Sequence, residues 1–246
     1  MTADPLAPLS ELPGVAEGVS AARTAVDALL SNRTVRRRSA EVSLESSLHG
    51  AWASARLAGA DFDLSEVRSG SATPDPVVQG ALRAHAAIGA LADTWTRAPR
   101  QALARLHVLA AADLVADTDA LGRPVAGAAT RLDMLASVLT TTAAPAVVVA
   151  AIVHGEVFSL DAFAPVSGIV ARVAVRLTLI ERGLDPKSLV VVEAGHLELQ
   201  DEYAAALSAY RGGSPDGVAR WIRHCAEAVV VGAREATAIC EAITRS

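Results

Sequence analysis

The chain has 246 residues, of which 52% are hydrophobic, 20% are charged and only 3% are aromatic. This length suits one large domain or two small ones, and it can bury a core without metals or disulfides. The 27 acidic residues outnumber the 22 lysines and arginines, so the formal net charge is −5. That balance excludes a general nucleic-acid or anionic-membrane binder, which needs clustered excess basic charge.

Residues 1–13 contain three prolines and are predicted to form a flexible arm. The remainder is rich in Ala, Leu, Arg and Glu, which favour helix, and poor in alternating β-branched or aromatic stretches. Nothing divides it, so residues 14–246 are predicted to be one all-α domain. Helices are predicted at residues 15–30, 35–57, 76–96, 99–115, 131–139, 145–160, 168–182, 197–210 and 214–244.

Turn chemistry marks the ends of several of these segments. Gly59 suits the position just beyond the helix at 35–57. Asp63, with Glu66 three residues later, predicts a capping box and a short helix. Residues 117–130 carry two glycines and a proline and predict a turn or small hairpin. The β-branched run at 188–192 predicts a short extended segment.

No targeting or membrane-spanning segment is expected. Residues 1–10 lack the basic and apolar regions of a signal peptide. The most apolar run, residues 143–153, is shorter than the roughly 20 residues that a spanning helix needs. Cys225 and Cys240 are too few for a disulfide scaffold and lack zinc-site spacing, so both are expected to be buried small side chains. These features predict a soluble, cytoplasmic protein.

The common catalytic motifs are absent from the sequence. There is no P-loop, no dinucleotide-binding G-x-G-x-x-G after a strand, and no G-x-S-x-G elbow. The histidines never pair at i, i+4 spacing, so no metal site is predicted and each is expected at the surface or the core edge. The six are His49, His85, His107, His154, His196 and His224.

One segment resembles a known family. Residues 150–186 read AAIVHGEVFSLDAFAPVSGIVARVAVRLTLIERGLDP. This stretch resembles the core of the Fic (Fido-fold) family, whose signature loop H-P-F-x-[DE]-G-N-G-R-x-x-R lies between two helices. Asp161 to Arg172 aligns with that loop without a gap. Further matches inside and around it are Phe163, Gly168, His154, Phe158, Leu177, Gly183, Leu184 and Pro186.

Two other regions agree in order and spacing, so the resemblance covers roughly residues 41–222. The segment from Ser54 to Gly59, followed by residues 62–67, resembles the family's inhibitory-helix motif S-x-x-I-E-G-N-x-L-T-L-E-E-V. Tyr203, Tyr210 and Trp221 resemble its tail. The resemblance implies a single Fic-like helical domain with a central antiparallel helix pair. It also implies a β-hairpin flap before the motif. Residues 121–130 stand at that place and would form at most a short version of the flap.

Fic enzymes usually transfer a nucleotide monophosphate to a protein hydroxyl. Their motif His is the general base, an acidic residue holds Mg²⁺, and the Gly-rich turn and arginines bind phosphate. Here Asp161 stands in place of the His, and an aspartate with a pKa near 3.9 is a poor base at neutral pH. Pro165 replaces the acidic residue. Gly168 and Arg172 are retained, while Val166, Ser167 and Ile169 depart from the family pattern.

The front motif has also changed, because Ala58 stands where the inhibitory Glu normally pairs with the last motif arginine. Ser54 and Gly59 keep their places. The resemblance therefore leaves three interpretations: an unregulated enzyme, a site whose catalytic and inhibitory ends were lost together, or an unrecognised activity.

The favoured hypothesis is a degenerate Fic-fold protein that lacks standard nucleotidyl transfer and acts as a regulatory or partner-binding protein. One alternative is an AMPylation-type transferase that uses ATP and Mg²⁺, with Asp161, Ser167, Gly168 and Arg172 doing residual work. Another is a small-molecule or anion-binding module that reuses the cleft. No cofactor is otherwise expected. The expected partners are proteins of unknown identity, with no nucleic acid and no membrane, and a homodimer is left open.

Arg172 needs a partner if it lies in the old cleft, since a buried unpaired charge is costly. Three arrangements are considered. Arg172 reaches solvent or a helix C-terminus, it forms an ion pair with Asp161 or Glu156, or it still binds an anion at the helix start near Gly168.

Overall fold

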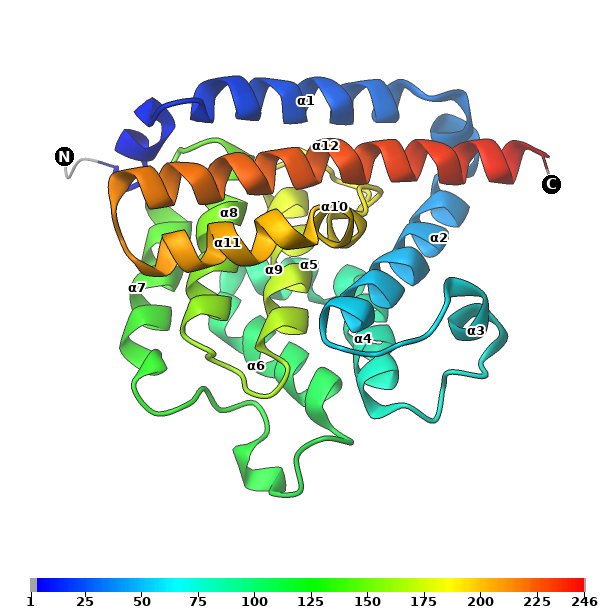
Figure 1. The fold of residues 1–246 in the computed structure, drawn as a ribbon, viewed down its shortest axis with the longest axis horizontal. Coiled ribbons are helices and arrows are strands. Elements are labelled where there is room, and N and C mark those ends of the chain that lie inside the picture. The colour runs from blue at the N-terminus through cyan, green and yellow to red at the C-terminus, as the bar shows by residue number, and fades with distance from the viewer. Residues whose placement is uncertain (1–3, 246) are drawn as a thin grey trace.

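The chain folds into a bundle of helices in a computed structural model that describes residues 4–245 (Figure 1). No strand is present in this described part, which confirms the all-α prediction. None of its helices is both long and apolar enough to cross a bilayer. The α-helices are α1 (Val15–Ser31), α2 (Arg33–Leu57), α3 (Leu64–Ser69), α4 (Pro76–Ala86), α5 (Ile88–Arg97), α6 (Pro99–Ala111), α7 (Ala128–Thr141), α8 (Ala146–Ser159), α9 (Ser167–Glu181), α10 (Val192–Glu198), α11 (Gln200–Arg211) and α12 (Pro215–Arg245).

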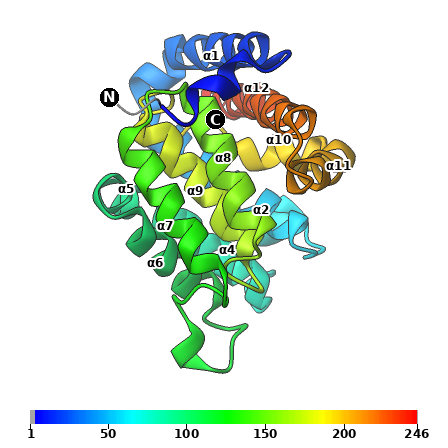
Figure 2. The same ribbon diagram turned by 90° about the vertical axis from the view of Figure 1, so that its left-hand side faces the viewer.

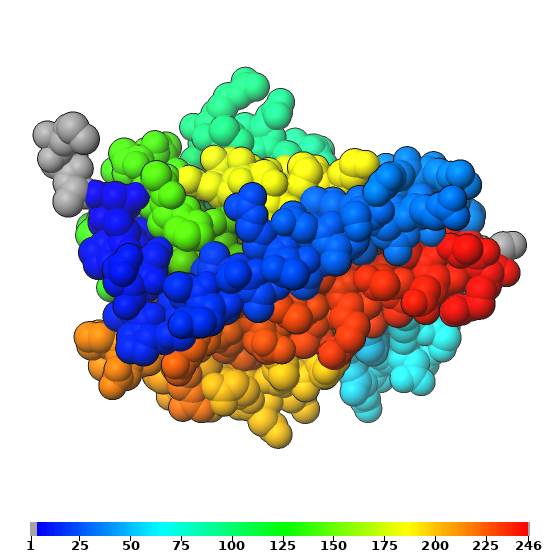
Figure 3. Space-filling model, turned by 90° about the horizontal axis from the view of Figure 1, so that it is seen from above, coloured from blue at the N-terminus to red at the C-terminus, as the bar shows by residue number. Residues whose placement is uncertain are grey.

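Helices α8 and α9 form the predicted central antiparallel pair. Most of their residues are buried, and α8 is apolar on nearly every side, whereas α9 also buries Arg172 and Arg176. A helix that is hydrophobic all round needs neighbours on all its faces. Helices α5, α6 and α7 lie to one side of the pair and α10 and α11 to the other (Figure 2). On top, α1 and α12 lie side by side along the molecule (Figure 3).

Residues 4–13 contact the domain. They contain the 3-10 helix η1 (Ala7–Glu11). The Asp4 carboxylate accepts hydrogen bonds from Thr142 Oγ1 at 2.8 Å and from the Ala143 N–H at 2.7 Å. Leu6 is buried against the core. These contacts argue against an arm detached from the domain over this stretch, and residues 1–3 lie outside the described part.

Several predicted boundaries are corrected by the structure. The hairpin flap is wrong, because within the described chain residues 121–127 form irregular turns between the 3-10 helix η2 (Thr118–Ala120) and α7. This segment has too few β-branched residues to hold two paired strands. Residues 188–191 pair with no strand either. The helices predicted at 76–96 and 197–210 are each divided in two, near Ala87 and Leu199.

The local end signals behave as predicted. Gly59 follows α2 with a φ of +96°, which favours glycine. The capping box forms at α3, where the Asp63 N–H donates to Glu66 Oε2 at 2.8 Å. Both cysteines are free and buried.

Two glycines let α10 lie directly against α12. A Cβ atom on Gly195 would lie 2.1 Å from the Ala228 carbonyl oxygen, and one on Gly232 would lie 2.6 Å from the Val191 carbonyl oxygen. The Val191 N–H donates to the Gly232 carbonyl at 3.2 Å. This close approach brings the residue after Gly195, which is His196, against α12.

We predict that Gly195→Ala destabilises the fold by about 1–3 kcal/mol, because the added methyl group forces α10 away from α12. Urea denaturation measures the change. Gly89→Ala is the matched control, since its Cβ would meet no atom within 4 Å. Alanine in helix α5 should be neutral or stabilising by about 0.5–1 kcal/mol. Equal stability of the two variants would contradict the close-contact explanation.

Candidate functional site

The loop that joins α8 to α9 holds most of the residues singled out from the sequence. Phe163 and Val166 are buried in the core. Ser167, at the start of α9, is also buried, and its Oγ accepts a hydrogen bond from the Phe163 N–H at 2.9 Å. Its hydroxyl therefore fixes the loop and does not point into an open cleft. Asp161 is exposed, with a φ of +46°.

Arg172 is enclosed in the second turn of α9, with 1% of its surface exposed. Its Nε donates to Ser54 Oγ at 2.9 Å and its Nη2 donates to the Ser54 carbonyl at 2.9 Å. Its Nη1 donates to Tyr203 Oη at 3.3 Å. The guanidinium therefore bridges α2 and α11 through neutral oxygen atoms.

One of the arrangements considered for Arg172 is wrong, because it is not paired with a carboxylate. Arg172 does not reach solvent either, but it does reach a helix C-terminus, since the Ser54 carbonyl that it contacts lies in the last turn of α2. Asp161 is exposed, and Glu156 instead binds Arg131 at 2.6 and 2.8 Å and accepts from Tyr210 Oη at 2.6 Å. The acceptors around Arg172 are a hydroxyl, a carbonyl and a phenol, and none of them is charged.

Of the three residues that the inhibitory-helix resemblance singled out on α2, only Ser54 contacts Arg172. Ser54 is fully buried against Arg172, whereas Ala58 and Gly59 are exposed at the end of α2. Gly168 does lie beside Arg172, because a Cβ on it would be 3.0 Å from Arg172 Nη1. The structure thus brings together Ser54, Gly168 and Arg172, and leaves Asp161 and Ala58 outside the group.

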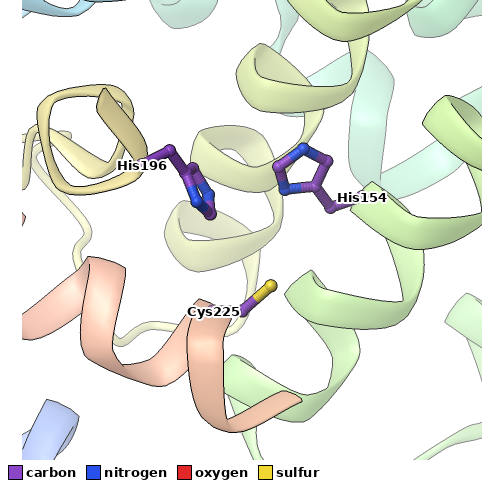
Figure 4. Close-up of side chains that lie close together, drawn as sticks. All are labelled: His154, His196 and Cys225. Carbon is purple, nitrogen blue, oxygen red and sulfur yellow. The ribbon is translucent and has the colours of Figure 1, made fainter. Parts of the chain in front are cut away.

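A buried cluster of rings and sulfur adjoins Arg172 and was missed from the sequence. His154 Nε2 lies 2.7 Å from Tyr203 Oη, the same atom that Arg172 contacts. His196 Nδ1 lies 3.0 Å from His224 Nε2. Cys225 follows His224 on α12, and its sulfur points toward the rings of His154 and His196 (Figure 4). The cluster is enclosed by Trp221, whose Nε1 donates to the Ala151 carbonyl.

The prediction that the histidines lie at the surface or the core edge is wrong for most of them. Each comes from a different part of the chain, and only tertiary packing buries it. The buried ones are His85, His107, His154, His196 and His224. His154, Tyr203 and Trp221 were each matched to the family, yet no spacing in the sequence places them together. The adjacent His224 and Cys225 were the one weak signal.

Burial sets the protonation states of the cluster. Loss of solvent lowers the pKa values of His154 and His196 well below the usual value, and the nearby Arg172 charge lowers them further. Burial also raises the pKa of the Cys225 thiol and brings that of Tyr203 to about 12. At neutral pH these groups are uncharged, and the imidazoles keep free lone pairs.

We predict that Ser54→Ala destabilises the protein by about 1–3 kcal/mol, because it removes one acceptor from a buried guanidinium. Thermal unfolding should report a drop of several degrees, at about 2–4 °C per kcal/mol. Ser47→Ala, on the same helix and only half-buried, serves as the control and should change little. A Ser54→Ala variant as stable as the Ser47→Ala variant would mean that Arg172 does not depend on that hydroxyl.

The architecture is similar to solved structures of Fic proteins. A Fic family protein from Desulfovibrio desulfuricans G20 superimposes with a TM-score of 0.75 at 17% identity, over 92% of this chain and 75% of that one. A fragment of Fic-1 from C. elegans gives 0.71 at 14% identity, over 94% and 74%. A variant of that fragment gives 0.66 at 17% identity, over 90% and 71%.

No family model and no curated protein matches the sequence. The structural likeness shows that the chain has the Fic fold, as the resemblance predicted. At this level of identity it carries the fold alone.

Proposed function

We propose that this chain is a Fic-fold protein that does not carry out standard nucleotidyl transfer and that acts by binding other proteins. The observation that carries the proposal is the enclosure of Arg172. Its three donor nitrogens bind Ser54 and Tyr203, and 1% of the residue is exposed. Three of the five N–H donors of this side chain are thus engaged inside the protein, whereas transition-state stabilisation needs donors that face the developing charge.

The position of Asp161, which stands where Fic enzymes have their general base, supports the same conclusion. Asp161 is exposed, and its carboxylate makes no ion pair or side-chain hydrogen bond within the described residues. A catalytic base must be held within reach of the proton that it removes. Losing a positioned base costs on the order of 10²–10⁴-fold in rate.

The residues present do not fit a bound Mg²⁺–nucleotide complex. Pro165 has no side-chain oxygen for the metal, although Mg²⁺ prefers oxygen ligands. Val166 is buried at the helix start, and Ser167 is engaged by Phe163. We therefore assign no catalytic step to ATP or Mg²⁺ in this chain.

Under this proposal the functional part of the protein is its surface, which binds and regulates other proteins. A cytoplasmic location fits the two free cysteines and the absence of a bilayer-spanning helix among the described residues. A homodimer stays a prediction.

We predict no change in melting temperature with ATP, GTP, CTP or UTP, with or without Mg²⁺, and no transfer of labelled nucleotide to protein. A ligand at 100 times its Kd would add roughly 2.7 kcal/mol, which corresponds to several degrees here. Asp161→Asn is the control for background labelling, because it removes the carboxylate charge while asparagine tolerates the positive φ at this position. A melting shift or transfer signal that Asp161→Asn or Arg172→Gln removes would overturn the proposal.

The partner-binding half has its own test. We expect a tagged chain, expressed in its native cells, to co-purify with a protein at fixed stoichiometry. The two purified components should then form a complex with a measurable Kd. Light scattering on the chain alone separates a homodimer from a monomer. A chain that remains monomeric and forms no reconstituted complex would contradict this half and leave the nucleotide result unaffected.

A further inference from the structure

Three potential metal ligands meet inside the bundle from three separate helices. His154 lies on α8, His196 on α10 and Cys225 on α12 (Figure 4). One ligand atom from each lies within 4.8 Å of the other two, and all three residues are buried. From this juxtaposition we propose that His154, His196 and Cys225 form a Zn²⁺ site. The proposal stands independently of the proposed function.

The donor set fits zinc. Imidazole nitrogen and thiolate sulfur are the ligands that Zn²⁺ prefers, and three protein ligands with one further position is a common zinc arrangement. In a tetrahedral site with Zn–N near 2.0–2.1 Å and Zn–S near 2.3 Å, adjacent ligand atoms lie about 3.3–3.6 Å apart. The three atoms would need to close by at most about 1.5 Å, which small side-chain rotations supply.

The surrounding hydrogen bonds identify the ligand atoms. The Nε2 atom of His154 lies 2.7 Å from Tyr203 Oη, while its Nδ1 is buried and has no hydrogen-bond partner among the described residues. Such an orphaned buried nitrogen is costly unless something binds it. His196 Nδ1 lies 3.0 Å from His224 Nε2, which leaves the Nε2 of His196 for the metal. Metal-binding histidines usually hold their second nitrogen in this way.

The net charge of the bound metal and its ligands indicates what the fourth ligand would be. Binding replaces the Cys225 thiol proton with the metal, and that proton leaves to solvent. The metal and thiolate together carry one positive charge close to Arg172, which is bound to Tyr203. An anionic fourth ligand, hydroxide being the simplest, would neutralise that charge. The histidines are already neutral, so they coordinate without releasing protons.

The ligands lie inside the packed bundle, so loading is expected to accompany folding. Helix α10 contributes His196 through the close contact at Gly195, and α8 and α12 pack on either side of the site. Zinc supplied during expression or refolding should therefore be retained through dialysis. Zinc added to the folded apoprotein should enter slowly.

The test uses the full-length chain in a His49→Gln background. His49 lies 2.8 Å from Glu235 and 4.0 Å from Glu45, and this half-buried group could bind zinc on its own. The protein is refolded with ZnCl₂ or CoCl₂, dialysed, and assayed for metal by mass spectrometry and for Co²⁺ by absorption. We expect about one metal per chain and a sulfur-to-cobalt charge-transfer band. Removal by a chelator should lower the melting temperature.

The Cys225→Ser variant should lack the charge-transfer band, and its affinity for the metal should fall at least tenfold. Cys240→Ser is the matched control, because it removes another free, buried cysteine of α12 and should keep both. His154→Gln and His196→Gln should weaken the band. Absence of metal and band from the folded parent overturns the proposal, and so does metal held equally by Cys225→Ser.

Discussion

The buried guanidinium of Arg172 is the constraint on which the site depends. A positive charge cannot be left without acceptors in a protein interior. Ser54 on α2 and Tyr203 on α11 provide those acceptors from opposite sides of α9. The fold can keep this arginine only while both helices stay in place, so the contacts that satisfy the charge also hold α2 and α11 against α9.

A second arginine one turn later is buried in a different way. Arg176 binds Ser188 through Nε and Nη2, and its Nη1 lies 3.7 Å from Glu193, which also contacts His85 at 3.1 Å. Burial raises the pKa of Glu193, but Arg176 and His85 together bring it below its usual value. Arg176 therefore sits opposite a carboxylate, while Arg172 has only neutral acceptors. Burial is the main cause that lowers the pKa values of His154 and His196, and the charge of Arg172 adds to it.

The sequence predicted most of the helices, the loop between α8 and α9, and the Fic fold. It also placed Gly168 and Arg172 together, because both lie on one helix at local spacing. It could not assign the partner of Arg172, since Ser54 is 118 residues away. The motif singled out Ser54, Ala58 and Gly59, and of these only Ser54 is buried in the core. The His154, His196 and Cys225 group depends on three helix packings, and one of these requires the absence of a side chain at Gly195.

Tyr203 links the enclosed guanidinium of Arg172 to the buried cluster. Its Oη accepts from Arg172 and lies 2.7 Å from His154 Nε2, so an N–H on Nε2 can donate to it. That tautomer leaves the lone pair of His154 on Nδ1, the atom without a partner among the described residues. The contact that helps to enclose Arg172 therefore also orients His154 as the proposed Zn²⁺ site requires. One phenol oxygen thus contacts both the buried guanidinium and the buried ring cluster.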